Sequence, residues 1–296
     1  MATSALPLSG DRYRRWLDHW PLIVGFAIMA IPTIVTLGQQ VWTMEIGAHG
    51  PIVLATGIWL LATQRQDIGA LSRPGPIWQV AAIMVPALLL YVFGRAYDFI
   101  SLETLAVYAA LLAAALLLVG WRAMAANWFP LFYLAFLVPP PGWLIDKITS
   151  PLRMFISYAV TNALHGLGYP ISREGVTMTV AQYQLLVEDA CSGMNSIIGL
   201  TAITLLYIYL MHRASWRYAL LLVAFILPIA IVVNMVRVTV LVLLTYYYGD
   251  SVAQGFLHVT AGMMLFVLAL LLVFALDAAL QKLLARRRVA RAEVVA

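Results

Sequence analysis

The sequence has few charged residues and a single cysteine. Charged residues make up 10% of its 296 residues, hydrophobic residues make up 63%, and the mean hydropathy is +0.91. Soluble domains carry about 25% charged residues, so this composition excludes a soluble globular domain and indicates a polytopic membrane protein. One cysteine also excludes an intramolecular disulfide, which directs attention to the chemistry of the thiol.

Three further signals are absent from the sequence. The first apolar run after Met1–Trp20 has no small-residue cleavage site, so we expect no removable signal peptide. No glycine-rich phosphate loop follows a strand, and His165, His212 and His258 lie on separate elements or at different depths, so we expect no cofactor and no metal. The basic residues behind the net charge of +5 cluster at helix ends, which gives no reason to expect a nucleic-acid partner.

Apolar runs of about 20 residues, the length that crosses a bilayer, define the expected architecture. It is an all-α polytopic membrane protein with about eight transmembrane helices, one interfacial helix and a short extracytoplasmic β-hairpin. The expected spans lie near residues 20–38, 46–63, 77–94, 100–120, 126–139, 191–211, 216–237 and 256–281.

Two segments between the fifth and sixth spans do not fit a crossing. Residues 143–166 have a helical pattern with several polar side chains, which favours an interfacial helix over a ninth span. A re-entrant segment is the alternative. Residues 169–187 are rich in Val, Thr, Tyr and Ile around a polar turn at Arg173-Glu174-Gly175, which predicts a β-hairpin. It should lie outside the bilayer, because an open sheet edge cannot face lipid.

The distribution of basic residues predicts the orientation. With both termini in the cytoplasm, 13 of the 18 lysines and arginines lie on cytoplasmic segments, as the positive-inside rule requires. These thirteen are Arg12, Arg14, Arg15, Arg65, Arg73, Arg122, Arg213, Arg217, Lys282, Arg286, Arg287, Arg288 and Arg291. Both termini on one side require an even number of crossings, which also argues that residues 143–166 do not span.

Three unusual side chains then fall near the outer face. Cys191 opens the span that runs inwards, and His258 begins the last span. Arg237 lies about 20 residues after Arg217, roughly 30 Å of helix, which matches the thickness of the hydrocarbon core. Each has a simpler interpretation, since cysteine packs as a small residue, histidine forms interfacial hydrogen bonds and arginine snorkels to the headgroups. An arginine in an apolar run nevertheless costs about 2.5–3.5 kcal/mol on insertion scales, and all three residues coincide at one depth.

This set of residues suits acyl transfer through a thiol. A helix N-terminus and a nearby cation favour the thiolate of Cys191. His258 would take the thiol proton and later protonate the leaving amine, while Arg237 would bind the oxyanion. Ser192 is the alternative nucleophile.

Three supporting residues surround these candidates in the sequence. Asn234 precedes Arg237 by one helical turn and shares its face. Glu188 would repel a thiolate, so it is expected to orient His258 or Arg237, or to pair with Arg173.

The chain from Gly168 to about Phe274 resembles the core of the exosortase/archaeosortase family of membrane cysteine transpeptidases. The matching elements, in family order and spacing, are Arg173-Glu174-Gly175, Glu188 with Ala190-Cys191-Ser192-Gly193, Asn234 with Arg237-Val238, and His258 with Gly262 and Phe266. The first 167 residues match only as hydrophobic spans. The resemblance implies a catalytic core at 168–285, N-terminal transmembrane helices plus the interfacial helix at 1–167, and a basic cytoplasmic tail at 286–296.

The resemblance also implies an activity and a location. The protein would be a multi-pass bacterial inner-membrane cysteine endopeptidase or transpeptidase, with Cys191, Arg237 and His258 facing the outside of the lipid bilayer. Its partners would be membrane-anchored proteins with a C-terminal sorting signal of the PEP-CTERM type: a short motif such as Pro-Glu-Pro, a transmembrane helix and a basic tail. A thioester on Cys191 would be resolved by an amine, a hydroxyl or water. The oligomeric state is not indicated.

Two other functional classes fit part of the sequence. A non-catalytic transporter or polysaccharide-export component would use Arg237 to bind an anion while Cys191 merely packs. Such proteins usually have an internal repeat and a polar site near mid-membrane, and neither is evident here. A membrane hydrolase would use Ser192 with His258.

Overall fold

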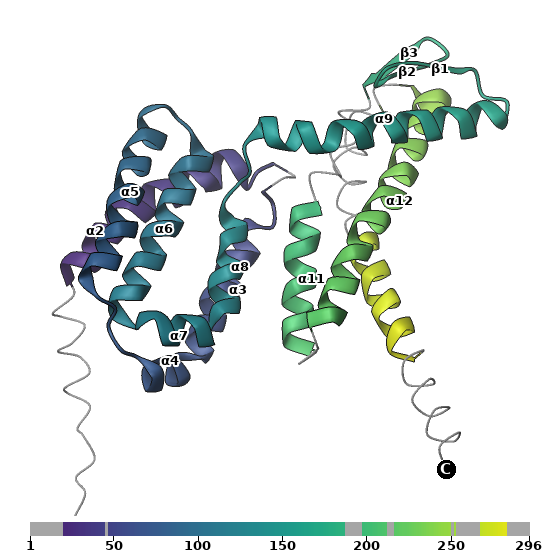
Figure 1. Cartoon of the computed structure of the whole chain (residues 1–296). Coiled ribbons are helices and arrows are strands. Elements are labelled where there is room, and N and C mark those ends of the chain that lie inside the picture. Colours follow the sequence, from purple (N-terminus) through teal and green to yellow (C-terminus); the bar gives the residue numbers. More distant parts are fainter. Residues whose placement is uncertain are drawn as a thin grey trace, which may run out of the picture. The chain divides into compact units, whose positions relative to one another are not determined.

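Helices make up most of the chain in the computed structural model, which describes residues 20–44, 47–186, 197–211, 216–249, 252 and 267–282 (Figure 1). The chain divides into two compact units. The first contains Met1–Thr43 and Leu54–Pro139, and the second contains Met44–Val53 and Pro140–Ala296. The predicted core at 168–285 lies within the second unit.

The helices from Trp20 to Leu137 are short to medium in length and mostly apolar. They are α2 (Trp20–Thr36), the π-helix η1 (Leu37–Val41), α3 (Gly50–Thr63), α4 (Arg65–Leu71), α5 (Ile77–Ala96), α6 (Ile100–Leu118), α7 (Gly120–Ala126), α8 (Trp128–Leu134) and the 3-10 helix η2 (Ala135–Leu137). On α6 the buried residues Ala106, Ala110 and Ala113 form a small-residue face. Such a face lets α2 and α5 approach α6 closely.

One polar cluster holds α2, α5 and α6 together. Glu103 on α6 is buried, and the Thr33 hydroxyl of α2 donates a 2.6 Å hydrogen bond to its Oε1. Arg95, in the last turn of α5, lies 3.3 Å from the same oxygen. A carboxylate among apolar helices requires such partners, so these contacts stabilise the first unit.

The second unit combines long helices with a small sheet. Its elements are α9 (Gly142–Gly166), β1 (Ile171–Glu174), β2 (Thr177–Val180), β3 (Tyr183–Leu186), α11 (Ile197–Met211), α12 (Trp216–Tyr248) and a helical segment at 267–282. The three strands form an antiparallel sheet in the order β1-β2-β3. Figure 1 shows α9 lying across α12, with the strands beside the end of α12.

The sheet has one strand more than the predicted hairpin. Glu174 pairs with Thr177 across the first loop, and both connections have two residues. Gly175 and Ala181 begin these loops with φ of 62° and 52°, the positive values that tight hairpin turns need. The sequence interpretation treated residues 169–187 as a hairpin with a single turn and missed the second turn at Ala181. The location of the sheet outside the bilayer stays a prediction.

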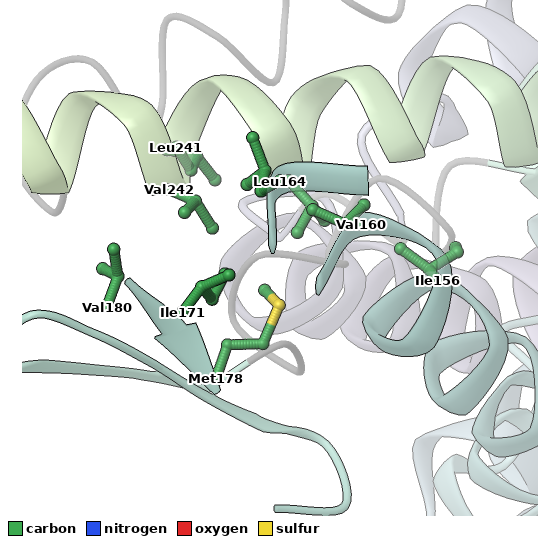
Figure 2. Packing of buried hydrophobic residues seen from close by; sticks show 9 residues of the cluster. Ile156, Val160, Leu164, Ile171, Met178, Val180, Leu241 and Val242 are labelled. Carbon is green, nitrogen blue, oxygen red and sulfur yellow. The ribbon is translucent and has the colours of Figure 1, made fainter. Parts of the chain in front are cut away.

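Two apolar clusters lie along one face of α12. The upper cluster joins α12 to α9 and the sheet and contains Ile156, Val160, Leu164, Ile171, Met178, Val180, Val238, Leu241 and Val242 (Figure 2). The lower cluster joins α12 to α11 and to the segment 267–282 and contains Leu200, Ile226, Val233, Ala269 and Val273. The contacts of α12 therefore hold together the described parts of the second unit.

Several helices are long and apolar enough to cross a membrane. Four described helices meet this criterion, namely Trp20–Val41, Ile77–Ala96, Ile100–Leu118 and Tyr218–Tyr248, and Trp128–Leu137 with Gly142–Gly166 would make a fifth if they form one broken span. Gly50–Thr63 and Ile197–Met211 are shorter apolar helices. A helix or helical piece thus lies in each predicted span, and the total of eight crossings stays a prediction.

The predicted end of the span at 216–237 is wrong. Helix α12 has 33 residues, about 50 Å, and continues to Tyr248. The hydropathy pattern breaks at Arg237, but this side chain is only 2% exposed. The helix continues because Val238, Leu241 and Val242 bury their side chains against α9 and the sheet. The sequence interpretation placed Arg237 at the end of a span. In the structure Arg237 lies inside α12.

Candidate functional site

Two polar residues interrupt the apolar face of α12 between the two clusters. Asn234 is 3% exposed and Arg237 is 2% exposed, and their spacing of one helical turn places them on the same face. Val233 on one side belongs to the lower cluster, and Val238 on the other side belongs to the upper cluster. The two polar side chains therefore lie at the junction of the two clusters, which we call the α12 junction.

The burial of Arg237 argues against an interfacial anchor. A snorkelling arginine extends its guanidinium to the headgroups and leaves it exposed. Arg237 is instead the largest of the fully buried side chains in the described residues. An enclosed guanidinium is costly and is a functional hypothesis by default.

Asn234 adds a second polar group at the same place. In the part of the chain that the structure describes, neither its Oδ1 nor its Nδ2 has a hydrogen-bond partner. A buried amide without partners costs free energy, and buried polar groups are nearly always hydrogen-bonded. The α12 junction is therefore a place suited to receive a further polar group.

The start of α11 lies at the same junction. Ile197, its first residue, packs against both the upper and the lower cluster. The described chain therefore resumes at the level of Asn234 and Arg237, a few residues after Cys191 in the sequence. Cys191, Glu188 and His258 themselves lie outside the described residues.

Arg173 lies on the exposed surface of the sheet. Its guanidinium carbon lies 5.2 Å from the ring centroid of Tyr158 on α9, a cation–π contact. Its Nη1 also donates a 3.2 Å hydrogen bond to the carbonyl of Gly175. These contacts give Arg173 a role in joining β1 to α9. They do not bring it to the buried face of α12.

The structure adds His49, a residue that the sequence analysis missed. His49 is buried and belongs to the second unit, although it precedes most of the first unit in the chain. A Cβ at Gly199, in the first turn of α11, would lie 3.1 Å from the His49 Cβ and 3.2 Å from its Cγ and Nδ1. The imidazole thus packs directly on the turn that follows the Cys191 segment. Local sequence patterns cannot predict a contact between residues as far apart in the sequence as His49 and Gly199.

We expect Gly199→Ala to destabilise the second unit by about 1 kcal/mol, because the new methyl would crowd the His49 ring. Thermal unfolding of the purified protein in detergent measures this effect. The matched control is Gly25→Ala on α2, where a Cβ meets nothing within 4 Å and better helix propensity favours the variant. The double variant His49→Ala/Gly199→Ala should regain part of the loss. Equal stability of Gly199→Ala and the native protein would contradict the packing described.

The described residues show no metal-binding group. No set of three or more His, Cys, Asp or Glu side chains among them could hold an ion.

One comparison with known proteins identified a family match. A family model described as transmembrane exosortase (Exosortase_EpsH) matches residues 41–275. The chain belongs to this family. The match confirms the resemblance seen in the sequence and, together with the apolar helices, identifies an exosortase-type membrane protein. None of the curated proteins matches the chain, and no solved structure does.

The match also extends beyond the positions that carried the sequence resemblance. It begins before α3 and includes His49, as well as every candidate residue from Arg173 to His258. The family model therefore covers helices that the sequence resemblance matched only as hydrophobic spans.

Proposed function

We propose that the protein is a membrane cysteine endopeptidase or transpeptidase that cleaves a C-terminal sorting signal through a thioester on Cys191. Membership of the exosortase family, a family of cysteine transpeptidases, supports this reaction class. The observation that carries the proposal is the buried Arg237 beside Asn234, at the level where α11 begins. In the proposed site the Cys191 thiol lies near this cation, and a nearby cation lowers a thiol pKa from its free value of about 8.5.

The reaction follows the usual order of acyl transfer. His258 takes the proton of the Cys191 thiol, and the thiolate attacks the scissile carbonyl carbon. Arg237 donates N–H groups to the oxyanion of the tetrahedral intermediate. The carbon–nitrogen bond then breaks, His258 gives its proton to the leaving amine, and the acyl group stays on the thiol. An amine, a hydroxyl or water attacks the thioester and releases the enzyme.

The supporting residues would act through these three. Asn234 has unused hydrogen-bonding capacity among the described residues, which suits it to hold either the Arg237 guanidinium or the substrate backbone. Glu188 would orient Arg237 or His258 by charge. Arg173, on the exposed sheet, would serve the stability of the β1–α9 contact.

The proposed substrates are proteins held in the same membrane. Each would carry a short motif outside the bilayer, then a transmembrane helix and a basic tail, as in PEP-CTERM signals. A site at the outer face of the bacterial inner membrane reaches a peptide bond just outside such a helix. The reaction is tested by following the size of a reporter protein with this signal in cells that do or do not express the enzyme. Retention of the full-length reporter in expressing cells would overturn the proposal.

The proposed orientation predicts a defined labelling pattern. The orientation that puts 13 of the 18 basic residues in the cytoplasm places Cys191 near the outer face. A membrane-impermeant maleimide should therefore label Cys191 in intact cells. In Cys191→Ala/Ala296→Cys, the single thiol should react only after lysis. Labelling of this variant in intact cells would place the C-terminus outside and the active site in the cytoplasm.

A further inference from the structure

A buried carboxylate lies beside the first turn of α12, away from the α12 junction inside the helix. Asp277, in the helical segment 267–282, is 1% exposed. The Tyr207 hydroxyl donates a 2.7 Å hydrogen bond to its Oδ2, and Gln281 Nε2 donates one of 2.8 Å to the same oxygen. The Tyr218 hydroxyl donates to Oδ1. Three side chains therefore converge on one carboxylate.

These hydrogen bonds link three helices. Tyr207 lies on α11, Tyr218 lies in the first turn of α12, and Asp277 and Gln281 lie on the segment 267–282. The ring of Tyr207 also packs on Phe274, with 4.6 Å between the centroids. We call Asp277, Tyr207 and Tyr218 the Asp277 node.

The same three helices are those that lead to the proposed catalytic residues. Helix α11 follows Cys191 in the chain, α12 contains Arg237, and the segment 267–282 follows His258. Their apolar contacts in the lower cluster are non-directional. A buried carboxylate is different, because burying it costs the fold several kcal/mol of stability unless its hydrogen-bond donors are in place. It therefore selects one axial register of the helices.

We propose that Asp277 is a positioning residue that sets the register of these helices and thereby aligns Cys191, Arg237 and His258. This inference rests on the proposed function. Arg237 lies 19 residues beyond Tyr218, roughly 28 Å along the same helix, which continues past Pro228 without a break. A shift at the node is therefore carried to the α12 junction. A displacement of about 1 Å in a reacting group is enough to cost roughly a hundredfold in rate.

The sole cysteine gives a direct test that needs no substrate. Iodoacetamide alkylates only the thiolate, so the pH dependence of alkylation of the intact protein in lipid nanodiscs reports the pKa of Cys191. We expect the native midpoint to lie below about 8.5. Tyr207→Phe and Tyr218→Phe each remove one hydroxyl and should raise the midpoint by about half a unit to one unit. At a pH one unit or more below the native midpoint, this lowers the alkylation rate about threefold to tenfold.

A matched control separates positioning from general loosening. Thr33→Val also removes a hydroxyl that donates to a buried carboxylate, but on α2 of the first unit. This variant should leave the pH midpoint of Cys191 alkylation unchanged. All alkylation rates are divided by the amount of folded protein in the sample.

The possible outcomes distinguish the inference from the function on which it rests. A native midpoint at the ordinary value, or a thiol that does not react at any pH, would overturn the proposed function and this inference with it. A lowered native midpoint that both tyrosine variants retain would overturn the role of Asp277 alone. An equal shift in Thr33→Val would also overturn it.

Discussion

Cells that express Cys191→Ala should accumulate full-length substrate while the enzyme itself inserts normally. The thiol is the only group of the enzyme that bonds to the acyl carbon in the proposed mechanism, so its loss removes covalent catalysis altogether. We expect processing to fall by about 10³-fold or more, to the limit of detection on a blot, since loss of a nucleophile has effects of this order. Substrate size on a blot and the amount of enzyme in the membrane fraction measure the two parts of the prediction.

Cys191→Ser is the companion variant. A serine hydroxyl is far less ionised than a thiol at neutral pH, and we expect it to be nearly as inactive as alanine. Normal processing by Cys191→Ala would eliminate the thiol mechanism and favour Ser192 with His258. Normal processing by Cys191→Ser alone would indicate a site that also activates a hydroxyl.

The class of fold could be predicted because it depends on composition. A chain with 63% hydrophobic residues must bury its backbone in apolar helices. Helical pieces accordingly lie in each predicted span. Helix ends were harder to predict, because hydropathy treats every charge as a boundary. Arg237 shows the error, since protein rather than water surrounds it and α12 continues to Tyr248.

The small sheet shows a different limit. Residues with β propensity predicted strands, and Gly175 predicted a turn. The second turn begins at Ala181, with a φ of 52°. Alanine gives no turn signal in a sequence, because positive φ is unfavourable for it. The third strand was therefore missed.

The candidate site could be predicted in part. Arg237 and Asn234 stand out in an apolar sequence, and the structure buries both on one face. Their place at a junction of two clusters depends on side-chain packing between distant segments, which no local pattern encodes. The same is true of His49 on Gly199 and of the tyrosines around Asp277.

Arg237→Lys should reduce processing by about 10²- to 10³-fold, the usual effect of removing an oxyanion donor. Lysine keeps the charge but loses the planar fork that donates two parallel hydrogen bonds. The matched control is Arg95→Lys, the same change at an arginine whose side chain is 49% exposed. It should process substrate at a near-normal rate.

A rise in pH separates the role of Arg237 from that of His258. His258→Ala loses the base that ionises the thiol, so a medium near pH 9 should restore part of its activity by forming thiolate without a base. The same medium should not rescue Arg237→Lys, because the missing function is the stabilisation of the oxyanion after attack. Mass spectrometry of the covalent adduct on Cys191 measures acylation in both variants across pH. Should Arg237→Lys process substrate as fast as the native enzyme, the arginine serves only in packing α12, and the catalytic set reduces to Cys191 and His258.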